Sequence, residues 1–227
     1  MTTLHVVKVF VGPGGTGGNP LGVFLDAADV PAARRQEIAA DLGYSETVFV
    51  ADAARGRLWI HTPARELPLA GHPLVGTAWL LAEQGRPVDV LRPPAGEVAT
   101  WQDDGRTWIR ADPNLAPHFD RTRLGSAAEV DAHPGAGPDA HLQVWAWEDE
   151  PAGRVRVRVF PTSMGVAEDE ATGSAAMLLG RDLGRPLTIR QGVGSEILVR
   201  PGPEGTIEVG GRVEPLETRT YDLAGQP

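Results

Sequence analysis

Apolar and polar residues alternate over many short stretches of this 227-residue chain, and glycine or proline separates one stretch from the next. Alternation with a period of two predicts half-buried β-strands. Between the first two of these strands, the glycines at 12–18 predict a loop, and Asn19-Pro20 predicts a turn. The strands that we expect lie at 4–11, 21–25, 46–51, 56–61, 88–91, 98–109, 142–147, 155–160, 187–190, 196–199 and 206–209.

Three segments have the spacing of helices instead. Residues 31–42 form the first, with Pro31 near its start and Gly43 just past its end. Residues 71–84 and 173–183 are apolar on nearly every side, so other elements must enclose each of these two helices. A strongly curved sheet around each helix would do so.

The predicted elements follow a similar order in the two halves of the chain. Each half has strands before and after one apolar helix, which predicts an α+β protein of two similar domains with a cleft between them. Residues 112–140 are rich in Pro, Gly and Ala without strong periodicity, and we interpret them as the linker and irregular start of the second half. The domains that we expect are 1–111 and 112–227, and the end of the chain can cross back to the first half.

The two apolar helices begin in similar sequences. The first is Glu66-Leu-Pro-Leu-Ala-Gly71-His72 and the second is Glu168-Asp169-Glu-Ala-Thr172-Gly173-Ser174. In each, a glutamate precedes a glycine by five residues, and a polar residue follows the glycine. Helix N-termini carry unpaired N–H groups that bind anions, so two of them can converge on one ligand. Helix capping, with Thr172 as the cap, explains either segment by itself but does not require the same arrangement twice.

Charge and composition exclude several classes of function. The formal net charge of −9 argues against a nucleic-acid partner, because phosphate binding needs a basic surface. No apolar run approaches the ~20 residues that cross a membrane, and the start lacks a signal-peptide pattern, so we expect a cytoplasmic protein. The absence of cysteine excludes disulfides and thiolate nucleophiles. The only lysine, Lys8, lies in a predicted strand, and the histidines show no ligand spacing, so we expect neither Schiff-base chemistry nor a metal site.

Glu46, His72 and Ser174 are the residues whose surroundings suggest chemistry. Glu46 precedes the apolar run Val48-Phe49-Val50, and desolvation there would raise its pKa toward the range of a general acid or base. A solvated position at the strand end is the alternative. His72 begins a helix, whose dipole lowers the pKa of an imidazole, so a neutral His72 could contact a ligand or relay a proton. The alternative is a histidine that only hydrogen-bonds a neighbouring loop. Ser174 and the amides after Gly173 can hold a carboxylate, whereas no Gly-x-Ser-x-Gly elbow supports Ser174 as a nucleophile.

Four segments together resemble the phenazine-biosynthesis PhzF-like family, which shares its fold with diaminopimelate epimerase. They occur in the order of the family and span most of the chain. The segments are Gly18–Phe24, Tyr44–Val50, Thr62-Pro63 with Glu66–His72, and Glu168–Ala175. The resemblance implies a pseudo-twofold pair of similar domains, each a curved, barrel-like, mostly antiparallel sheet around a central helix, with the active site in the cleft.

The resemblance also implies residue roles. Glu46 would be the general acid/base, with His72 and Asp169 as further catalytic residues, and no metal or organic cofactor is expected. The residues that we assign to substrate binding are Asn19, Gly71, Gly173 and Ser174. In the phenazine enzyme, the reaction isomerises a dihydro-hydroxyanthranilate by moving a proton from one carbon to another. A homodimer is the oligomer that the family suggests.

Differences from related sequences narrow the chemistry. Epimerases of this fold use two thiols, whose positions correspond here to Ala70 and Thr172, and neither side chain is a base near pH 7. Cysteine-dependent epimerisation is therefore excluded. In the second half, Glu170 stands where the family usually has proline, and Gln191-Gly192 is followed by Val-Gly-Ser195 and not by Gly-Arg-Pro-Ser. These changes leave Glu46 intact, but the substrate need not be the phenazine precursor.

The leading hypothesis is a cofactor-independent isomerase acting on a small carboxylate-bearing metabolite. Glu46 would remove and return a proton on carbon, and helix N-termini, with Arg65 as a further candidate, would bind the anion. Two alternatives stay open. One is a lyase or cyclase that uses the same glutamate, and the other is a binding protein of this fold that has lost turnover.

Overall fold

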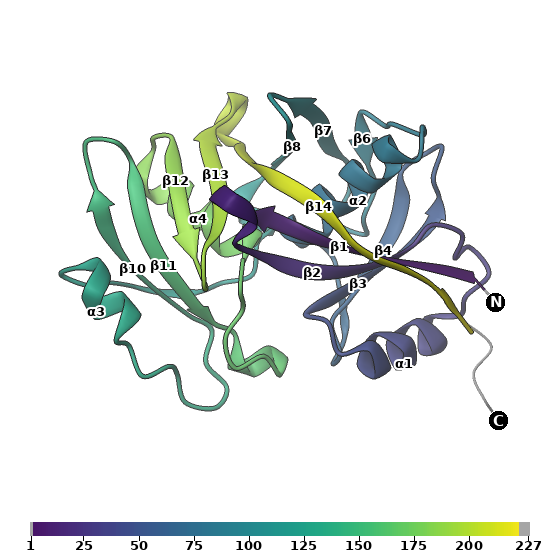
Figure 1. Ribbon diagram of the computed structural model, residues 1–227, viewed down its shortest axis with the longest axis horizontal. Helices are drawn as coiled ribbons and strands as arrows, with labels where there is room; N and C mark the ends of the chain where they lie inside the picture. Colours follow the sequence, from purple (N-terminus) through teal and green to yellow (C-terminus); the bar gives the residue numbers. More distant parts are fainter. Residues whose placement is uncertain (1, 223–227) are drawn as a thin grey trace.

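The computed structural model describes residues 2–222, in which the strands join edge to edge into one extended sheet. The sheet bends into two lobes that lie side by side, with strands β1 and β14 running along the middle (Figure 1). Each lobe wraps around one apolar helix, α2 (Gly71–Glu83) in the first lobe and α4 (Gly173–Leu183) in the second. The predicted α+β fold of curved sheets around two central helices is confirmed.

The first lobe is built on consecutive strands. Most neighbours are antiparallel, but β2 and β3 are parallel because helix α1 (Ala32–Leu42) carries the chain back between them. α1 ends at Gly43, which takes the left-handed conformation with φ 67°. The strands are β1 (Thr2–Val11), β2 (Gly17–Phe24), β3 (Glu46–Asp52), β4 (Arg57–His61) and β5 (Glu66–Leu67).

The second lobe repeats this scheme with its own crossover. β11 and β12 are parallel, and α4 lies in the connection between them. The edge strand β9 pairs in parallel with β10. The short helix α3 (Ala127–Asp131) connects these two strands and packs on β10 and β11. The strands are β9 (Asp120–Arg123), β10 (Leu142–Asp149), β11 (Arg154–Phe160), β12 (Leu187–Gln191) and β13 (Ser195–Pro201).

The long strand β14 (Ile207–Tyr221) connects the two lobes. Its first part lies between β13 and β8, where Val209 pairs with Val199 on one side and Ile109 on the other. Its later part pairs with β1, with Val213 opposite Val9. The small strands β6 (Val90–Leu91), β7 (Val98–Asp103) and β8 (Arg106–Ala111) join the sheet through β14. The expected domain limits of 1–111 and 112–227 remain a prediction, since β14 belongs by sequence to the second range and pairs with the first strand.

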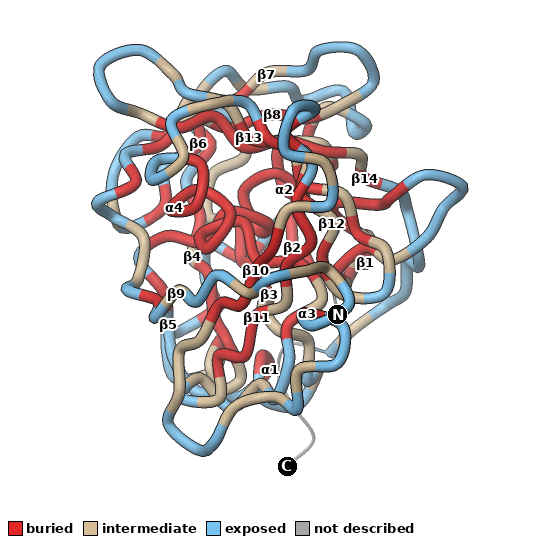
Figure 2. The backbone as a smooth tube through the Cα atoms, turned by 90° about the vertical axis from the view of Figure 1, so that its left-hand side faces the viewer, coloured by how far each residue is buried: buried red, intermediate tan, exposed pale blue. Residues whose placement is uncertain are grey.

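One apolar core runs through both lobes. Leu74 and Leu81 of α2, Met177 of α4 and apolar residues of the surrounding strands belong to the same cluster of buried side chains. Figure 2 shows buried chain concentrated around α2 and α4, with exposed loops outside it. At Gly76 a Cβ would lie 2.6 Å from a methyl of Leu21, so glycine is needed for α2 to approach the sheet this closely.

Two sequence predictions in this part of the chain are wrong. Asn19 and Pro20 do not form a turn but lie within β2, opposite Val9 and Lys8. Pro20 is tolerated because the pairing of β2 with β3 begins only at Leu21, so no ladder bond is missing on that side. Residues 12–18 are not all loop either, because β2 begins at Gly17.

The segment 112–140 contains more regular structure than its sequence predicts. It includes β9, α3 and the single-turn helix Pro113–Leu115. Ser126 accepts a hydrogen bond from the Glu129 N–H at the start of α3, and the Glu129 carboxylate accepts from Gly125, so capping stabilises a helix too short to show periodicity. The last strand was expected at 206–209 but extends to Tyr221. Its later residues are exposed, which removes the alternation that would have marked them.

Candidate active site

The N-termini of α2 and α4 meet at the boundary between the lobes. A Cβ on Gly71 would lie 2.9 Å from Cα of Gly173, and a Cβ on Gly173 would lie 3.0 Å from the backbone nitrogen of His72. Only glycine at both positions allows this approach. Neither helix has a side-chain cap, so no side chain of the cap residues takes up the first N–H groups. The two similar sequences thus place two helix ends together, as predicted.

A small cavity of about 30 Å³ lies beside these helix ends and takes its walls from both lobes. Most of the wall is apolar, and the carboxyl groups of Glu46 and Asp169 are its ionisable groups. No lysine or arginine is among the described residues that line it, and Arg65 is not on its wall. The lining residues are Ser45, Glu46, Thr62, Leu67, Leu69, Ala70, Pro117, Phe119, Pro161, Met164, Val166, Asp169, Thr172 and Ser174.

Glu46 begins β3 and is held almost out of water, with 14% of its side chain exposed. Burial, reinforced by the negative charge of Asp169, raises the pKa of Glu46 to about 8, against the opposing hydrogen bond from Ser45. Its Oε2 has no hydrogen-bond partner among the described residues. The alternative of a solvated strand end is therefore wrong, and Glu46 carries an exchangeable proton near neutral pH.

His72 lies beside Glu46, in the first turn of α2. Its Nδ1 is 3.2 Å from Oε2 of Glu46, and only 2% of its side chain is exposed. Burial lowers the pKa of His72 to about 3, although the carbonyl of Pro20 opposes the shift. The imidazole is therefore neutral at physiological pH, as the sequence predicts, and it can accept or pass on a proton.

Asp169 lies on the wall contributed by the second lobe. One carboxylate oxygen, Oδ1, accepts from the amide of Asn19 at 2.7 Å, and the other accepts from the Thr172 hydroxyl at 2.6 Å. Burial raises the pKa of Asp169 to about 6, while these two hydrogen bonds lower it and the charge of Glu170 raises it. Because Glu46 and Asp169 influence each other, their two apparent pKa values belong to the pair.

The remaining predicted residues take different places. Ser174 lines the cavity at the start of α4, whereas Gly71 and Gly173 lie where the helices touch. Asn19 is buried behind Asp169 and is absent from the cavity wall, with its amide bonded to Asp169 and to the carbonyl of Ala171. Substrate binding by Asn19 stays a prediction, and its observed contacts are those of a residue that orients Asp169.

Two contributors escaped the sequence analysis. Thr172 was considered as a helix cap, but its hydroxyl does not cap α4 and donates to Asp169. Gln191 is fully buried, and its amide donates to the Thr172 hydroxyl and to the Asp169 carbonyl, both at 2.9 Å. Gln191 is distant in sequence, so no local pattern could reveal it. The sequence singled out Thr172 as a helix cap and as one of the two thiol positions of the epimerases, but not as a hydrogen-bond donor to Asp169.

Solved structures define the class of fold. A PhzF-family phenazine biosynthesis protein from Enterococcus faecalis superposes with a TM-score of 0.75, at 20% identity, over 96% of this chain and 97% of that one. A probable proline racemase from Agrobacterium radiobacter K84 superposes with a TM-score of 0.64, at 11% identity, over 98% and 93%. The fold is that of the epimerase-like proteins.

Sequence comparison then identifies the family. The family model described as phenazine biosynthesis-like protein matches residues 8–132. The trans-2,3-dihydro-3-hydroxyanthranilate isomerase of Pseudomonas fluorescens is 33% identical over 248 residues, covering 87% of this chain and 89% of that protein. The enzyme of the same name from Pseudomonas aeruginosa is 33% identical over 80% of each chain. This chain belongs to the phenazine biosynthesis-like (PhzF) family, and these relatives are named as isomerases.

Neither a cluster of metal-ligating side chains nor a membrane-length apolar helix occurs among the described residues. Among residues 2–222, no group of three or more His, Asp or Glu side chains is arranged to hold a metal ion. No helix in the same range has the length and apolar character needed to cross a membrane.

Proposed function

We propose that this protein is a cofactor-independent isomerase that moves a proton between carbon atoms of a small carboxylate-bearing metabolite, with Glu46 as the general acid/base. One observation carries the proposal: a nearly buried glutamate, with a pKa of about 8 and its Oε2 3.2 Å from Nδ1 of His72, faces a cavity at two helix N-termini. Membership of the PhzF family, whose relatives are named isomerases, supports it.

The proposed reaction needs only proton transfers. Glu46 acts in its ionised form, whose fraction grows as the pH approaches its pKa of about 8. It takes a proton from a C–H bond, so that an O–H bond forms and the electron pair moves into the adjacent conjugated system. N–H groups at the starts of α2 and α4 stabilise the enolate-like state. The Glu46 O–H then protonates a different carbon, which restores the carboxylate. His72 and Asp169 position or relay the proton, and the overall change is balanced without oxidant or reductant.

The cavity indicates the kind of substrate. Its walls are mainly apolar, which suits a small ring. Because no lysine or arginine among the described residues lines it, the substrate carboxylate is assigned to the helix N-termini. The names of the relatives make trans-2,3-dihydro-3-hydroxyanthranilate the first compound to test.

Turnover in deuterated water tests the proposal. The wild-type protein is expected to isomerise this compound and to incorporate deuterium at carbon, measured by NMR and mass spectrometry. Glu46→Gln should lower turnover about 10²–10⁴-fold while calorimetry still detects binding, because the amide keeps the shape but cannot exchange the proton. Glu37→Gln, on the exposed face of α1, is the matched control and should keep full activity.

Three outcomes would contradict the proposal. Wild-type turnover in the Glu46→Gln variant would remove Glu46 from the mechanism. A product that has lost water would identify a lyase or cyclase in place of an isomerase. Binding without deuterium incorporation would identify a binding protein that keeps the fold and has lost the reaction.

A further inference from the structure

Glu170 connects the active-site segment to a distant turn. It directly follows Asp169, and its carboxylate faces the turn between β12 and β13. One oxygen, Oε1, accepts from the Ser195 hydroxyl at 2.7 Å and from the Val193 N–H at 3.1 Å. The other oxygen accepts from the same N–H at 3.0 Å. At Gly192 a Cβ would overlap the Glu170 carboxylate, so this turn is shaped to receive it.

The same turn holds the start of β2 in the other lobe. Ser195 is fully buried, and its hydroxyl oxygen accepts from the Gly18 N–H at 2.8 Å. A Cβ on Gly17 would lie 2.6 Å from that oxygen, which shows how closely the two segments pack. The hydroxyl of Thr16 adds a second hydrogen bond between the segments, to the carbonyl of Gly194 at 3.3 Å.

These contacts close a ring at Asp169. Gly18 is followed by Asn19, whose amide donates to Asp169 at 2.7 Å, and Asp169 is followed by Glu170. The ring therefore runs from Glu170 through Ser195, Gly18 and Asn19 to Asp169. It crosses the boundary between the lobes twice, so the start of β2 and the segment 169–170 cannot shift independently.

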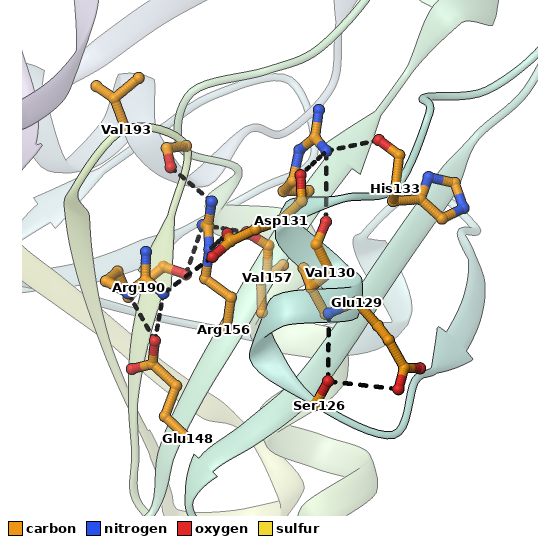
Figure 3. A network of polar contacts seen from close by, with 12 residues as sticks. Ser126, Glu129, Val130, Asp131, His133, Glu148, Arg156, Val157, Arg190 and Val193 are labelled. Atoms are coloured by element: carbon orange, nitrogen blue, oxygen red, sulfur yellow. Dashed lines mark hydrogen bonds and ion pairs between the residues drawn. The ribbon is translucent and has the colours of Figure 1, made fainter.

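A buried arginine fixes the turn from its other side. The side chain of Arg156 is 6% exposed, and it donates to the Gly192 carbonyl at 2.8 Å and to the Asp131 carboxylate at 2.6 Å. Figure 3 shows Arg156 among Asp131, Arg190 and the turn that contains Val193. The turn is thus anchored in the second lobe, and Glu170 and Ser195 bind to a rigid support.

We infer that Glu170 and Ser195 act as a pair of positioning residues for Asp169, through the hydrogen bonds that they impose on the start of β2. The inference rests on the proposed function in so far as Asp169 serves the reaction beside Glu46.

Ser195→Ala tests the hydrogen-bonded link. The change leaves the Gly18 N–H buried without its acceptor, so the start of β2 relaxes and the bond from Asn19 to Asp169 weakens. That bond lowers the pKa of Asp169, and its loss should raise the apparent value above about 6. We expect turnover to fall about tenfold or more, because small displacements of catalytic groups cost much rate.

The pKa of Asp169 is read by carboxyl ¹³C NMR titration of protein labelled at aspartate, with Asp169→Asn to assign the signal. This measurement needs no substrate. Ser163→Ala, at an exposed serine, is the matched control and should leave both the titration and the turnover of the wild type unchanged.

Glu170→Gln distinguishes the effect of the Glu170 charge on Asp169 from the effect of the hydrogen bonds that Glu170 accepts. The amide oxygen can still accept from Ser195 and Val193, as Oε1 does, so the ring is kept. The negative charge that raises the pKa of Asp169 is removed, and the apparent value should fall. The two variants are thus expected to shift the titration in opposite directions. Glu168→Gln removes the same charge from a side chain paired with Arg158 and should give a smaller shift.

Defined results overturn the inference. If folded Ser195→Ala keeps the wild-type titration and turnover, the hydrogen-bonded ring does not position Asp169. If Ser195→Ala lowers only thermal stability and keeps the titration and kcat, the link is merely structural. Absence of wild-type turnover on the test compound contradicts the proposed function, whereas the substrate-free titration still decides the inference.

Discussion

At the scale of single residues, the site is organised around carboxyl groups that the fold keeps from water. Glu46 and Asp169 have pKa values raised to about 8 and about 6, and in both cases burial is the first cause. Burial also shifts the pKa of His72, but lowers it, because the charged form of an imidazole is the protonated one. The fold thus creates a proton-carrying glutamate beside a neutral imidazole, at a cost in stability that depends on pH.

The first prediction concerns this pH dependence. His72 is neutral when folded and titrates near 6.5 when unfolded, so above pH 6.5 it adds only a small rise in stability, about 0.4 kcal/mol, of opposite sign. Glu46 keeps its proton up to about pH 8 when folded but loses it near 4.5 when unfolded, so the native state binds more protons between these values. The free energy of unfolding should therefore fall by about 1–2 kcal/mol from pH 6.5 to 8.5.

Urea unfolding at several pH values checks this expectation. Glu46→Gln should show a flatter profile over the same window and should gain stability relative to the wild type as pH rises. Glu37→Gln should keep the wild-type slope, because Glu37 is exposed in α1. Parallel profiles for the wild type and Glu46→Gln would mean that Glu46 is ionised in the folded protein at neutral pH.

At the scale of elements, the two central helices touch end to end. Their contact depends on Gly71 and Gly173. A side chain at either glycine would separate the helix ends. The proposed binding of the substrate carboxylate at these N-termini therefore depends on two helices from different lobes and on no single segment.

The second prediction follows from this contact. In Gly71→Ala, the methyl would meet the Gly173 backbone at 2.9 Å, which outweighs the better helix propensity of alanine. We expect a loss of about 1–3 kcal/mol in the free energy of unfolding and a loss of about 10²-fold in kcat/KM. Gly137→Ala, where a Cβ meets open space and φ is not left-handed, is the control and should behave as the wild type.

At the scale of the whole molecule, β14 and the continuous core make the two lobes interdependent. β14 pairs with β13 and β8 in its first part and with β1 in its later part. The cavity has walls from both lobes, so its shape depends on how they are held together. Cooperative unfolding of the entire chain is the expected consequence.

The third prediction tests this cooperativity with one cavity-forming change in each lobe. Leu81→Ala in α2 and Met177→Ala in α4 each remove a fully buried side chain and should cost about 2–5 kcal/mol. If the lobes unfold together, either variant should speed hydrogen exchange in both β3 and β10. Faster exchange confined to the lobe that carries the substitution would show two independent folding units.

Local sequence patterns predict much of this architecture. The two helices with apolar residues on nearly all sides, the glycine that ends α1 and most strands were predictable, because period and capping act over a few neighbouring residues. The absence of cysteine excluded thiol chemistry without any structure. The motif around Glu46 and the repeated glycine segments pointed to the site through the family resemblance.

Tertiary structure decided what depends on distant parts of the chain. Pairing with β1 placed Asn19 in a strand, and exposure hid the long end of β14 from any periodic signal. The raised pKa of Glu46 requires enclosure by both lobes, and the ring from Glu170 through Ser195 joins residues far apart in sequence. Periodicity reports which residues are buried, whereas desolvation and long-range hydrogen bonds depend on which buried groups meet.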